Sequence, residues 1–307
     1  MTDFQPLEVF APATTANLGP GFDCLGMALD LWNRLEVLPV EQGAEPASAV
    51  EVLGEGIEEL ASDSTNLTYR AMQFLYDEAG LEMPPLRLRC HNAIPLSRGM
   101  GSSAAAISGG LVAANALCGG PYSSSEILEM AATIEGHPDN VAAAVMGGLQ
   151  LVVSDGPQLY TAPIPVPDDV QAVLFIPDTR IATADARAVL PSKVTVADAV
   201  FNMGRVALLV AGMALDRTEY MDVATQDKLH QPYRQPLFPA IKVIFSAARA
   251  AGALGVFLSG SGSTVLALTK GREMTVAYEM FEAARLTAVP GRLEITRPTP
   301  AGAHTKA

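Results

Sequence analysis

One stretch decides how the rest of the chain is interpreted: Pro95-Leu96-Ser97-Arg98-Gly99-Met100-Gly101-Ser102-Ser103-Ala104-Ala105. Before it, Leu86 to His91 alternates apolar and polar residues as a strand does, and Ser102 to Leu117 after it is an Ala-rich run without proline. Gly99 and Gly101 let backbone N–H groups approach a ligand, and a helix N-terminus adds unpaired donors and a partial positive charge. The stretch therefore predicts a phosphate-binding loop, and a nucleoside triphosphate is a ligand that suits it.

Other interpretations of this loop depend on the residues that come after it. A Walker P-loop is excluded because no Gly-Lys-Ser/Thr is present. The spacing Gly99-x-Gly101-x-x-Ala104 fits the loose dinucleotide fingerprint, but residues 115–125 contain no Asp or Glu to bind a ribose. A hydrolase nucleophile elbow would need a glycine where Ala104 stands, followed by an ordered acid and histidine. A helix capped by Ser102 or Ser103, with no ligand, remains open from the loop alone.

Composition narrows the class of protein. The chain has 307 residues, which predicts two domains, and 49% hydrophobic residues, which excludes a disordered chain. A net charge of -13 argues against a nucleic-acid partner. No basic start with an apolar segment and no apolar run of about 18 residues occurs, so we expect no export, no membrane span and a cytoplasmic location. Cys24, Cys90 and Cys118 fit buried thiols in a reducing compartment.

A second Gly/Pro-rich stretch lies near the start of the chain. Leu7 to Pro12 predicts a strand that enters a loop from Ala13 to Asp23. Asn17 and Asp23 place polar groups between two apolar segments, where an unpaired carboxylate is costly. Capping and Asx-turn roles are the competing interpretation for both. Further predicted elements are strands at Leu35–Val40 and Val50–Leu53 and a helix from Leu67 to Ala79, capped within residues 63–66.

Polar residues gather again at the end of the helix that Ser123–Glu126 opens. Glu135 precedes Gly136 and the turn His137-Pro138-Asp139-Asn140, and an apolar helix follows from Val141 to Met146. Glu135 is a candidate Mg²⁺ ligand, with Ser103 as a second oxygen, because Mg²⁺ typically takes one or two protein oxygens beside phosphate oxygens. The alternatives are a solvated helix-end charge for Glu135 and a capping role for Asp139 or Asn140.

The second half of the chain predicts a separate layer. Pro163 to Asp169 is a Pro-rich linker, so we expect domains at 1–165 and 166–307. Strands and helices in mixed order indicate an α+β sandwich. The expected elements are strands 170–176, 255–259, 264–268 and 292–296, and helices 196–215, 239–251 and 274–287.

Three motifs together resemble the GHMP small-molecule kinases, and within that family the homoserine kinases most closely. They are residues 11–23, the loop Pro95–Ala105, and Ser259-Gly260-Ser261-Gly262-Ser263-Thr264. The form Asn-Leu-Gly-Pro-Gly-Phe-Asp of the first motif and the run from Glu135 to Val141 carry the closer likeness. Ser263 departs from the pattern, because a proline usually stands there, but both glycines of the third motif remain.

The resemblance implies a two-domain GHMP kinase fold: an N-terminal sheet covered by helices, and a ferredoxin-like C-terminal domain. It implies ATP and Mg²⁺ as cofactors, with Pro95 to Ala105 and Asn66 on the nucleotide and Ser103 and Glu135 on the metal. L-Homoserine would be the phosphoryl acceptor, in a step leading to threonine. Arg187 and Arg234 match segments that bind its carboxylate, Asp23 would take the ammonium group, and Asn17, His137 and Gly260 would complete the pocket.

For catalysis, the same likeness places Asn140 near the hydroxyl and Thr183 near the reacting groups. Asp139 is the candidate general base, but homoserine kinases are thought to proceed without one, so the sequence leaves its role open. Arginine suits a carboxylate because its planar fork donates two parallel hydrogen bonds. A kinase for mevalonate or a sugar is the alternative. Partners would be these small molecules, and a homodimer is compatible with the sequence, which does not decide the oligomeric state.

Overall fold

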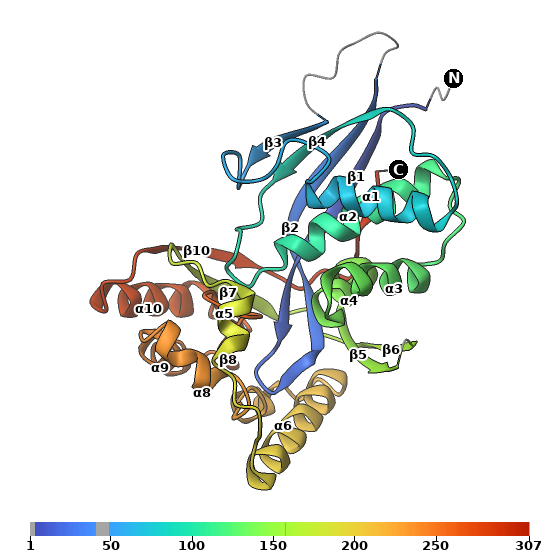
Figure 1. Cartoon of the computed structure of the whole chain (residues 1–307). Coiled ribbons are helices and arrows are strands. Elements are labelled where there is room, and N and C mark those ends of the chain that lie inside the picture. Colours follow the sequence, from blue (N-terminus) through green and yellow to red (C-terminus); the bar gives the residue numbers. More distant parts are fainter. Residues whose placement is uncertain (1–3, 41–48, 157, 307) are drawn as a thin grey trace.

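The computed structural model describes residues 4–40, 49–156 and 158–306. In these ranges the N-terminal part of the chain, with β11 from its C-terminal end, forms a seven-stranded sheet (Figure 1). The strand order is β11-β1-β2-β4-β3, β5 also pairs with β2, and β6 pairs with β5. Its strands are β1 (Leu7–Asn17), β2 (Gly21–Pro39), β3 (Val50–Gly54), β4 (Leu86–Asn92), β5 (Leu149–Asp155), β6 (Gln158–Ile164) and β11 (His304–Thr305).

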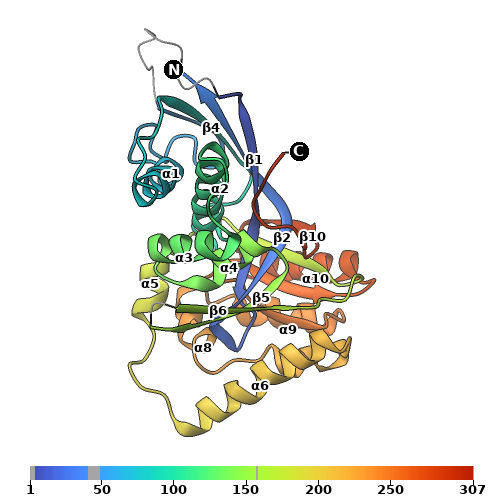
Figure 2. The same cartoon turned by 90° about the vertical axis from the view of Figure 1, so that its right-hand side faces the viewer.

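Four helices lie together on one side of this sheet (Figures 1 and 2). They are α1 (Leu67–Glu78), α2 (Ser102–Leu117), α3 (Ser124–Glu135) and α4 (Pro138–Met146). Local sequence explains where they begin. The Asn66 side chain caps α1, and Ser123 with Glu126 forms a capping box on α3, as the sequence predicted. The apolar residues of these helices and of the sheet form a hydrophobic core that includes Met72, Leu88 and Ile107.

The prediction of a loop from Ala13 to Asp23 is largely wrong. β1 continues to Asn17 and β2 begins at Gly21, so a tight hairpin turn replaces the long loop. Strand pairing between β1 and β2 overrides the turn-forming tendency of the sequence, because the longer hairpin adds hydrogen-bonded residue pairs to the ladder. The turn preference survives at the tip: Asn17, Leu18 and Asp23 all have positive φ. β2 is 19 residues long and pairs with β1, β4 and β5.

The C-terminal part builds a four-stranded antiparallel sheet with the order β10-β7-β9-β8. Its strands are β7 (Gln171–Pro177), β8 (Gly255–Leu258), β9 (Val265–Thr269) and β10 (Gly291–Thr296). Helices precede β8 and join β9 to β10, which is the βαββαβ order of a ferredoxin-like fold. This confirms the predicted fold class. The helices are α5 (Thr183–Ala188), α6 (Val196–Ala214), α7 (Met221–Ala224), α8 (Gln231–Arg234), α9 (Ile241–Ala250) and α10 (Glu273–Leu286), with short 3₁₀ turns η1 (Thr218–Tyr220) and η2 (Gln235–Leu237).

Both faces of the second sheet are buried. Along β7, Val173 and Phe175 join a core with α9 and α10, while Leu174 and Ile176 join a core with β2, β5 and α6. Because alternate residues of a strand point to opposite faces, a strand buried on both sides is apolar throughout, as residues 172–176 are. The long hairpin β1–β2 therefore packs against the C-terminal sheet and carries the first motif into the contact between the two layers.

Helix α6 lies at the outer edge of the molecule (Figures 1 and 2). It is the one described helix that is long and apolar enough to meet the length and hydropathy criteria for a membrane span, and 22% of its most apolar window is buried. It carries Asp198 and Arg205, and Leu209 and Met213 are buried in the core. The C-terminal residues return to the first sheet, where β11 pairs with β1.

Candidate active site

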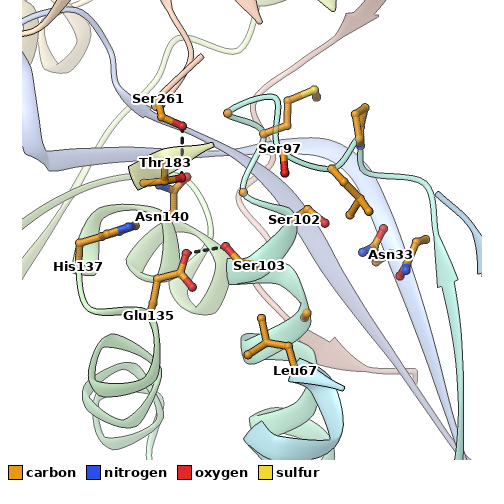
Figure 3. A pocket seen from close by; sticks show the side chains of 18 of the residues that line it. Asn33, Leu67, Ser97, Ser102, Ser103, Glu135, His137, Asn140, Thr183 and Ser261 are labelled. Atoms are coloured by element: carbon orange, nitrogen blue, oxygen red, sulfur yellow. Dashed lines mark hydrogen bonds between the residues drawn. The ribbon is translucent and has the colours of Figure 1, made fainter. Parts of the chain in front are cut away.

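A cavity of about 440 Å³ lies between the two layers, a size that suits a small ligand. It is lined by almost all the predicted site residues: Asn17, Asp23, Asn66, Pro95, Leu96, Ser97, Gly99, Met100, Gly101, Ser102, Ser103, Glu135, His137, Asp139, Asn140, Thr183, Arg187, Arg234 and Gly260. Figure 3 shows Ser97, Ser102 and Asn33 on one side and Glu135, His137 and Thr183 on the other. Residues from distant parts of the sequence therefore converge on one space.

The glycines of the loop are required by close contacts. Gly101 has φ +67° and precedes α2, and a Cβ there would lie 1.8 Å from the Thr14 Oγ1. Gly99 has φ +72°, and a Cβ there would lie 2.0 Å from the Ser259 carbonyl oxygen. Side chains at either position would separate the loop from its neighbours. The backbone can thus approach a phosphate at the N-terminus of α2, which is the geometry of an anion site.

The third motif, Ser259 to Thr264, is hydrogen-bonded to the backbone of the loop Pro95–Ala105. The Ser259 hydroxyl donates to the Gly99 carbonyl at 2.6 Å and lies 2.8 Å from the Thr15 hydroxyl of the first motif. The Gly260 N–H donates to the Ala16 carbonyl at 3.1 Å. Ser263, at the position of the expected proline, donates a hydrogen bond to the Thr179 carbonyl. The three motifs are therefore parts of one hydrogen-bonded assembly.

Ser103 and Glu135 meet at the N-terminus of α2. The Ser103 hydroxyl donates to the Glu135 Oε1 at 2.6 Å (Figure 3). Burial raises the pKa of the Glu135 carboxyl, although the hydrogen bond from Ser103 opposes this. Among the described residues, no three His, Cys, Asp or Glu side chains form a metal cluster. Two oxygen ligands fit a cation that also binds phosphate oxygens, so the pair suits Mg²⁺.

Asn140 is held by a residue that the sequence analysis missed. Its Oδ1 accepts a hydrogen bond from the Thr14 hydroxyl at 2.8 Å, and its backbone N–H donates to the Asp139 Oδ1 at 2.8 Å. Asp139 is 2% exposed, and the same oxygen lies 3.2 Å from the His137 Nδ1. The hydrogen bond to Asp139 raises the pKa of His137. The Asp139 carboxylate thus contacts the neighbouring residues His137 and Asn140 at the start of α4.

Charged side chains also line the cavity. Asp23 and Arg187 form a bidentate ion pair, with distances of 2.8 and 3.0 Å. Both side chains are more than a third exposed, so the pair is accessible to a ligand. Arg234 is 2% exposed, and burial lowers its pKa to about 10, so it stays charged at neutral pH. Its Nε donates to the Ala186 carbonyl and its Nη1 to the Gly260 carbonyl.

Three residues of the predicted loop do not line the cavity. Arg98 points to the C-terminal layer, where it donates to the Pro177 and Asp178 carbonyls, and Ala104 and Ala105 are buried in the packing of α2. Asn66 lines the cavity, but its amide donates to the Ala61 carbonyl and accepts from the Thr68 N–H.

Residues that the sequence analysis did not single out also contribute. Ser261 lies with its hydroxyl 3.5 Å from that of Thr183 (Figure 3). Asn33 lines the cavity near Ser102 and accepts two backbone hydrogen bonds, from Ala93 and Ile94. Thr14 and Ser261 fall inside quoted motifs, so those motifs were the available indication, whereas nothing in the strand sequence marked Asn33.

Comparisons with known proteins show the family. Residues 66–148 match the family model "GHMP kinases N terminal domain", and residues 213–284 match "GHMP kinases C terminal". The homoserine kinase of Moorella thermoacetica is 46% identical over 90% of this chain and 91% of its own. This chain belongs to the homoserine kinases of the GHMP family. The homoserine kinase of Carboxydothermus hydrogenoformans is 43% identical over 96% of this chain and 95% of its own.

Solved structures show the same fold for this kinase. A crystal structure of homoserine kinase from Cytophaga hutchinsonii matches with a TM-score of 0.88 and 29% identity, covering 99% of both chains. A mevalonate kinase from L. major matches with a TM-score of 0.69 at 16% identity, over 95% of this chain and 96% of its own, which shows the shared fold alone. The comparisons therefore favour the homoserine branch over the alternative of a mevalonate or sugar kinase.

Proposed function

We propose that this chain transfers the γ-phosphoryl group of ATP to the side-chain hydroxyl of L-homoserine, giving O-phospho-L-homoserine, within the route to threonine. The observation that carries the proposal is one cavity lined both by the N-terminus of α2 and by an Asp23–Arg187 pair beside Arg234; we take these as the nucleotide end and the acceptor end. The first end suits a polyphosphate, and the second suits an amino acid zwitterion.

At the nucleotide end, backbone N–H groups of the loop from Ser97 to Ser103 would bind the phosphates. Asn66 and Asn33 also line the cavity and would lie near the base. Ser103 and Glu135 would hold Mg²⁺, which supplies charge neutralisation on the phosphates when bound. Preorganised donors of this kind contribute most where charge develops during transfer.

At the acceptor end, the homoserine zwitterion would open the Asp23–Arg187 ion pair and bind both of its members. The ammonium group of homoserine takes Asp23, and its carboxylate takes Arg187 and the Nη2 of Arg234. A half-exposed ion pair is worth roughly 0–1 kcal/mol, so opening it costs little compared with the two charged contacts that replace it. A molecule with one of the two charges would break the pair and replace only half of it.

For the transfer itself, the hydroxyl oxygen of homoserine bonds to the γ-phosphorus as the bond to the β-phosphate oxygen breaks; ADP leaves, and the hydroxyl proton passes to an oxygen of the transferred phosphoryl group and then to solvent. Asn140, held by Thr14, would orient the hydroxyl, and Thr183 with Ser261 would face the reacting groups. Asp139 supports Asn140 and His137 rather than taking a proton. A loose, metaphosphate-like transition state asks little of a base, because the hydroxyl need not be deprotonated early.

The wider setting is part of the same proposal. We place the kinase in the cytoplasm, without a nucleic-acid or membrane partner, and keep a homodimer as an open prediction. Residues 1–165 and 166–307 are proposed as its domains; β6 of the first sheet ends at Ile164 and β7 of the second begins at Gln171, although β11 returns to the first sheet.

The test is turnover of ATP against homoserine, mevalonate, galactose and shikimate, with two matched analogues of homoserine. 4-Hydroxybutyrate lacks the ammonium group, and 3-aminopropan-1-ol lacks the carboxylate. We expect efficient turnover of homoserine alone and a loss of at least about 10²-fold in kcat/KM for each analogue, because each leaves one charged group unpaired. Comparable turnover of mevalonate, or of either analogue, would contradict the proposal.

A further inference from the structure

His230 lies fully buried between the first motif and Arg234, outside the cavity lining. Its Nε2 is 2.6 Å from the Gly19 carbonyl oxygen, and its Nδ1 is 3.1 Å from the Arg234 Nη1. The ring also stacks on Phe22, with centroids 5.1 Å apart and 24° between the planes. One imidazole therefore touches the turn that carries Asn17 and the guanidinium that faces the acceptor end.

The two contacts determine the state of the ring. A carbonyl oxygen only accepts, so Nε2 must carry the proton, and a guanidinium only donates, so Nδ1 must present its lone pair. A neutral imidazole with the proton on Nε2 is the one form that satisfies both. Burial lowers the pKa of His230, which keeps the ring neutral, although the Asp227 carboxylate 3.5 Å from Nε2 and the more distant Asp23 act in the opposite direction.

Asp227 is occupied by other donors. Its oxygens accept hydrogen bonds from the backbone N–H groups of Leu229, His230 and Gln231 at 2.7–3.0 Å, and from the Asn202 side chain at 2.7 Å. This carboxylate therefore fixes the backbone at the start of α8, and the ring remains available to Arg234.

The contacts of Arg234 leave one part of its side chain for a ligand. Nε donates to the Ala186 carbonyl at 3.1 Å, and Nη1 donates to His230 Nδ1 and to the Gly260 carbonyl at 2.9 Å. Nη2 donates to no other described residue, and Arg234 lines the cavity. Without His230, Nη1 would lose one of two acceptors in a buried site, and the guanidinium plane would be held less firmly, by Ala186, Gly260 and the Phe22 ring 5.5 Å away.

We propose that His230 is a positioning residue for the acceptor substrate: its neutral ring fixes the guanidinium plane of Arg234 so that Nη2 meets the substrate carboxylate. The inference rests on the proposed function, because it takes homoserine as the acceptor. It assigns His230 no contact with substrate and no proton transfer.

The test uses two substitutions that each keep one half of the ring. His230→Gln places an amide near the Nε2 position, so the tie to Gly19 is kept and the acceptor for Arg234 is lost. His230→Asn places an amide oxygen near the Nδ1 position, so the acceptor is kept and the tie to Gly19 is lost. We expect His230→Gln to raise the homoserine KM about tenfold or more, the scale of a hydrogen bond to a charged group, with kcat and the ATP KM within about threefold. His230→Asn should change the homoserine KM by less than about threefold.

Each substitution is then repeated with Arg234→Met, as a double-mutant cycle. If His230 acts through Arg234, His230→Gln adds less than about twofold to the homoserine KM in that background. Equal effects of Gln and Asn, or additive effects with Arg234→Met, would show a structural role only and overturn the inference. Failure of the wild type to phosphorylate homoserine is a separate result that overturns the proposed function.

A second measurement does not require a folded variant. Imidazole ¹⁵N chemical shifts of the wild-type kinase should show one histidine that is neutral and protonated on Nε2 through the neutral pH range. A charged His230, or one protonated on Nδ1, would contradict the arrangement.

Discussion

The two ends of the cavity are built from different parts of the chain. The proposed phosphate end consists of backbone groups of a contiguous stretch, Gly99 to Ser103, at the N-terminus of α2. The proposed acceptor end consists of charged side chains from β2, α5 and α8, whose positions, Asp23, Arg187 and Arg234, are far apart in the sequence. Backbone donors serve any phosphate, whereas placed charges distinguish one acceptor from another. A family of kinases can therefore keep its phosphate-binding backbone and differ in the charged side chains that select the acceptor.

The largest expected effect tests whether the phosphate end depends on close backbone approach. Gly101→Ala puts a methyl group against the Thr14 hydroxyl, 1.8 Å away, and should lower kcat by more than about 10²-fold, because small displacements of a reacting group are costly. Gly120→Ala is the matched control: Gly120 also has positive φ (+74°), but a Cβ there meets nothing within 4 Å. Equal losses in steady-state kcat for the two variants would mean that backbone strain, and not the contact, explains the effect.

The second prediction concerns the turn between the two ends. Asn140→Ala should lower kcat more than Asp139→Asn does, because it removes the proposed partner of the hydroxyl. Asp139→Asn should lose less than about 10²-fold in kcat, the low end of general-base effects, since Asp139 supports its neighbours. Both are measured as kcat against pH, with folding checked by thermal melts. A loss beyond about 10³-fold for a folded Asp139→Asn, with the acidic limb of the pH profile gone, would identify a base.

A third prediction tests whether the two arginines of the acceptor end bind homoserine and not ATP. Arg187→Ala and Arg234→Ala should each weaken homoserine binding by roughly 1.5–3 kcal/mol, with ATP affinity little changed, because each removes a hydrogen bond to a charged group. Calorimetric titration of both ligands measures this directly. Weaker ATP binding with homoserine affinity preserved would show that these arginines serve the nucleotide instead.

The smallest effect is a pH dependence of stability at His137. Its pKa is raised in the folded state, chiefly by the hydrogen bond with Asp139, so protonated His137 stabilises the fold. The contribution is complete below the unfolded pKa of about 6.5 and is lost as the pH rises through the folded value. Denaturant unfolding should therefore show a larger difference between wild type and His137→Gln at about pH 5.5 than at about pH 8.5. A larger difference at the higher pH would contradict this assignment.

The sequence predicted the helices well and one loop badly. Capping residues marked α1 and α3, and an uninterrupted Ala-rich run marked α2, to within a residue or two, since these are local properties; the N-cap of α2 is Gly101, not Ser102 or Ser103. The stretch from Ala13 to Asp23 was predicted as a loop from its Gly and Pro content, yet most of it lies in β1 and β2. Strand pairing with partners elsewhere in the chain decided that region, and local sequence does not contain those partners.

By itself, the sequence determined the glycine turn that opens α2, because glycine backbone freedom and a helix N-terminus are properties of neighbouring residues. It also named, through a family resemblance, most of the residues that line the cavity. Only the tertiary structure decided how those residues are used: that Asp23 and Arg187 pair with each other, that Thr14 holds Asn140, and that His230 reaches Arg234. The first two contacts join residues more than a hundred positions apart, and His230, four residues before Arg234, ties that arginine to the distant Gly19 carbonyl; partners so far apart leave no pattern in either segment alone.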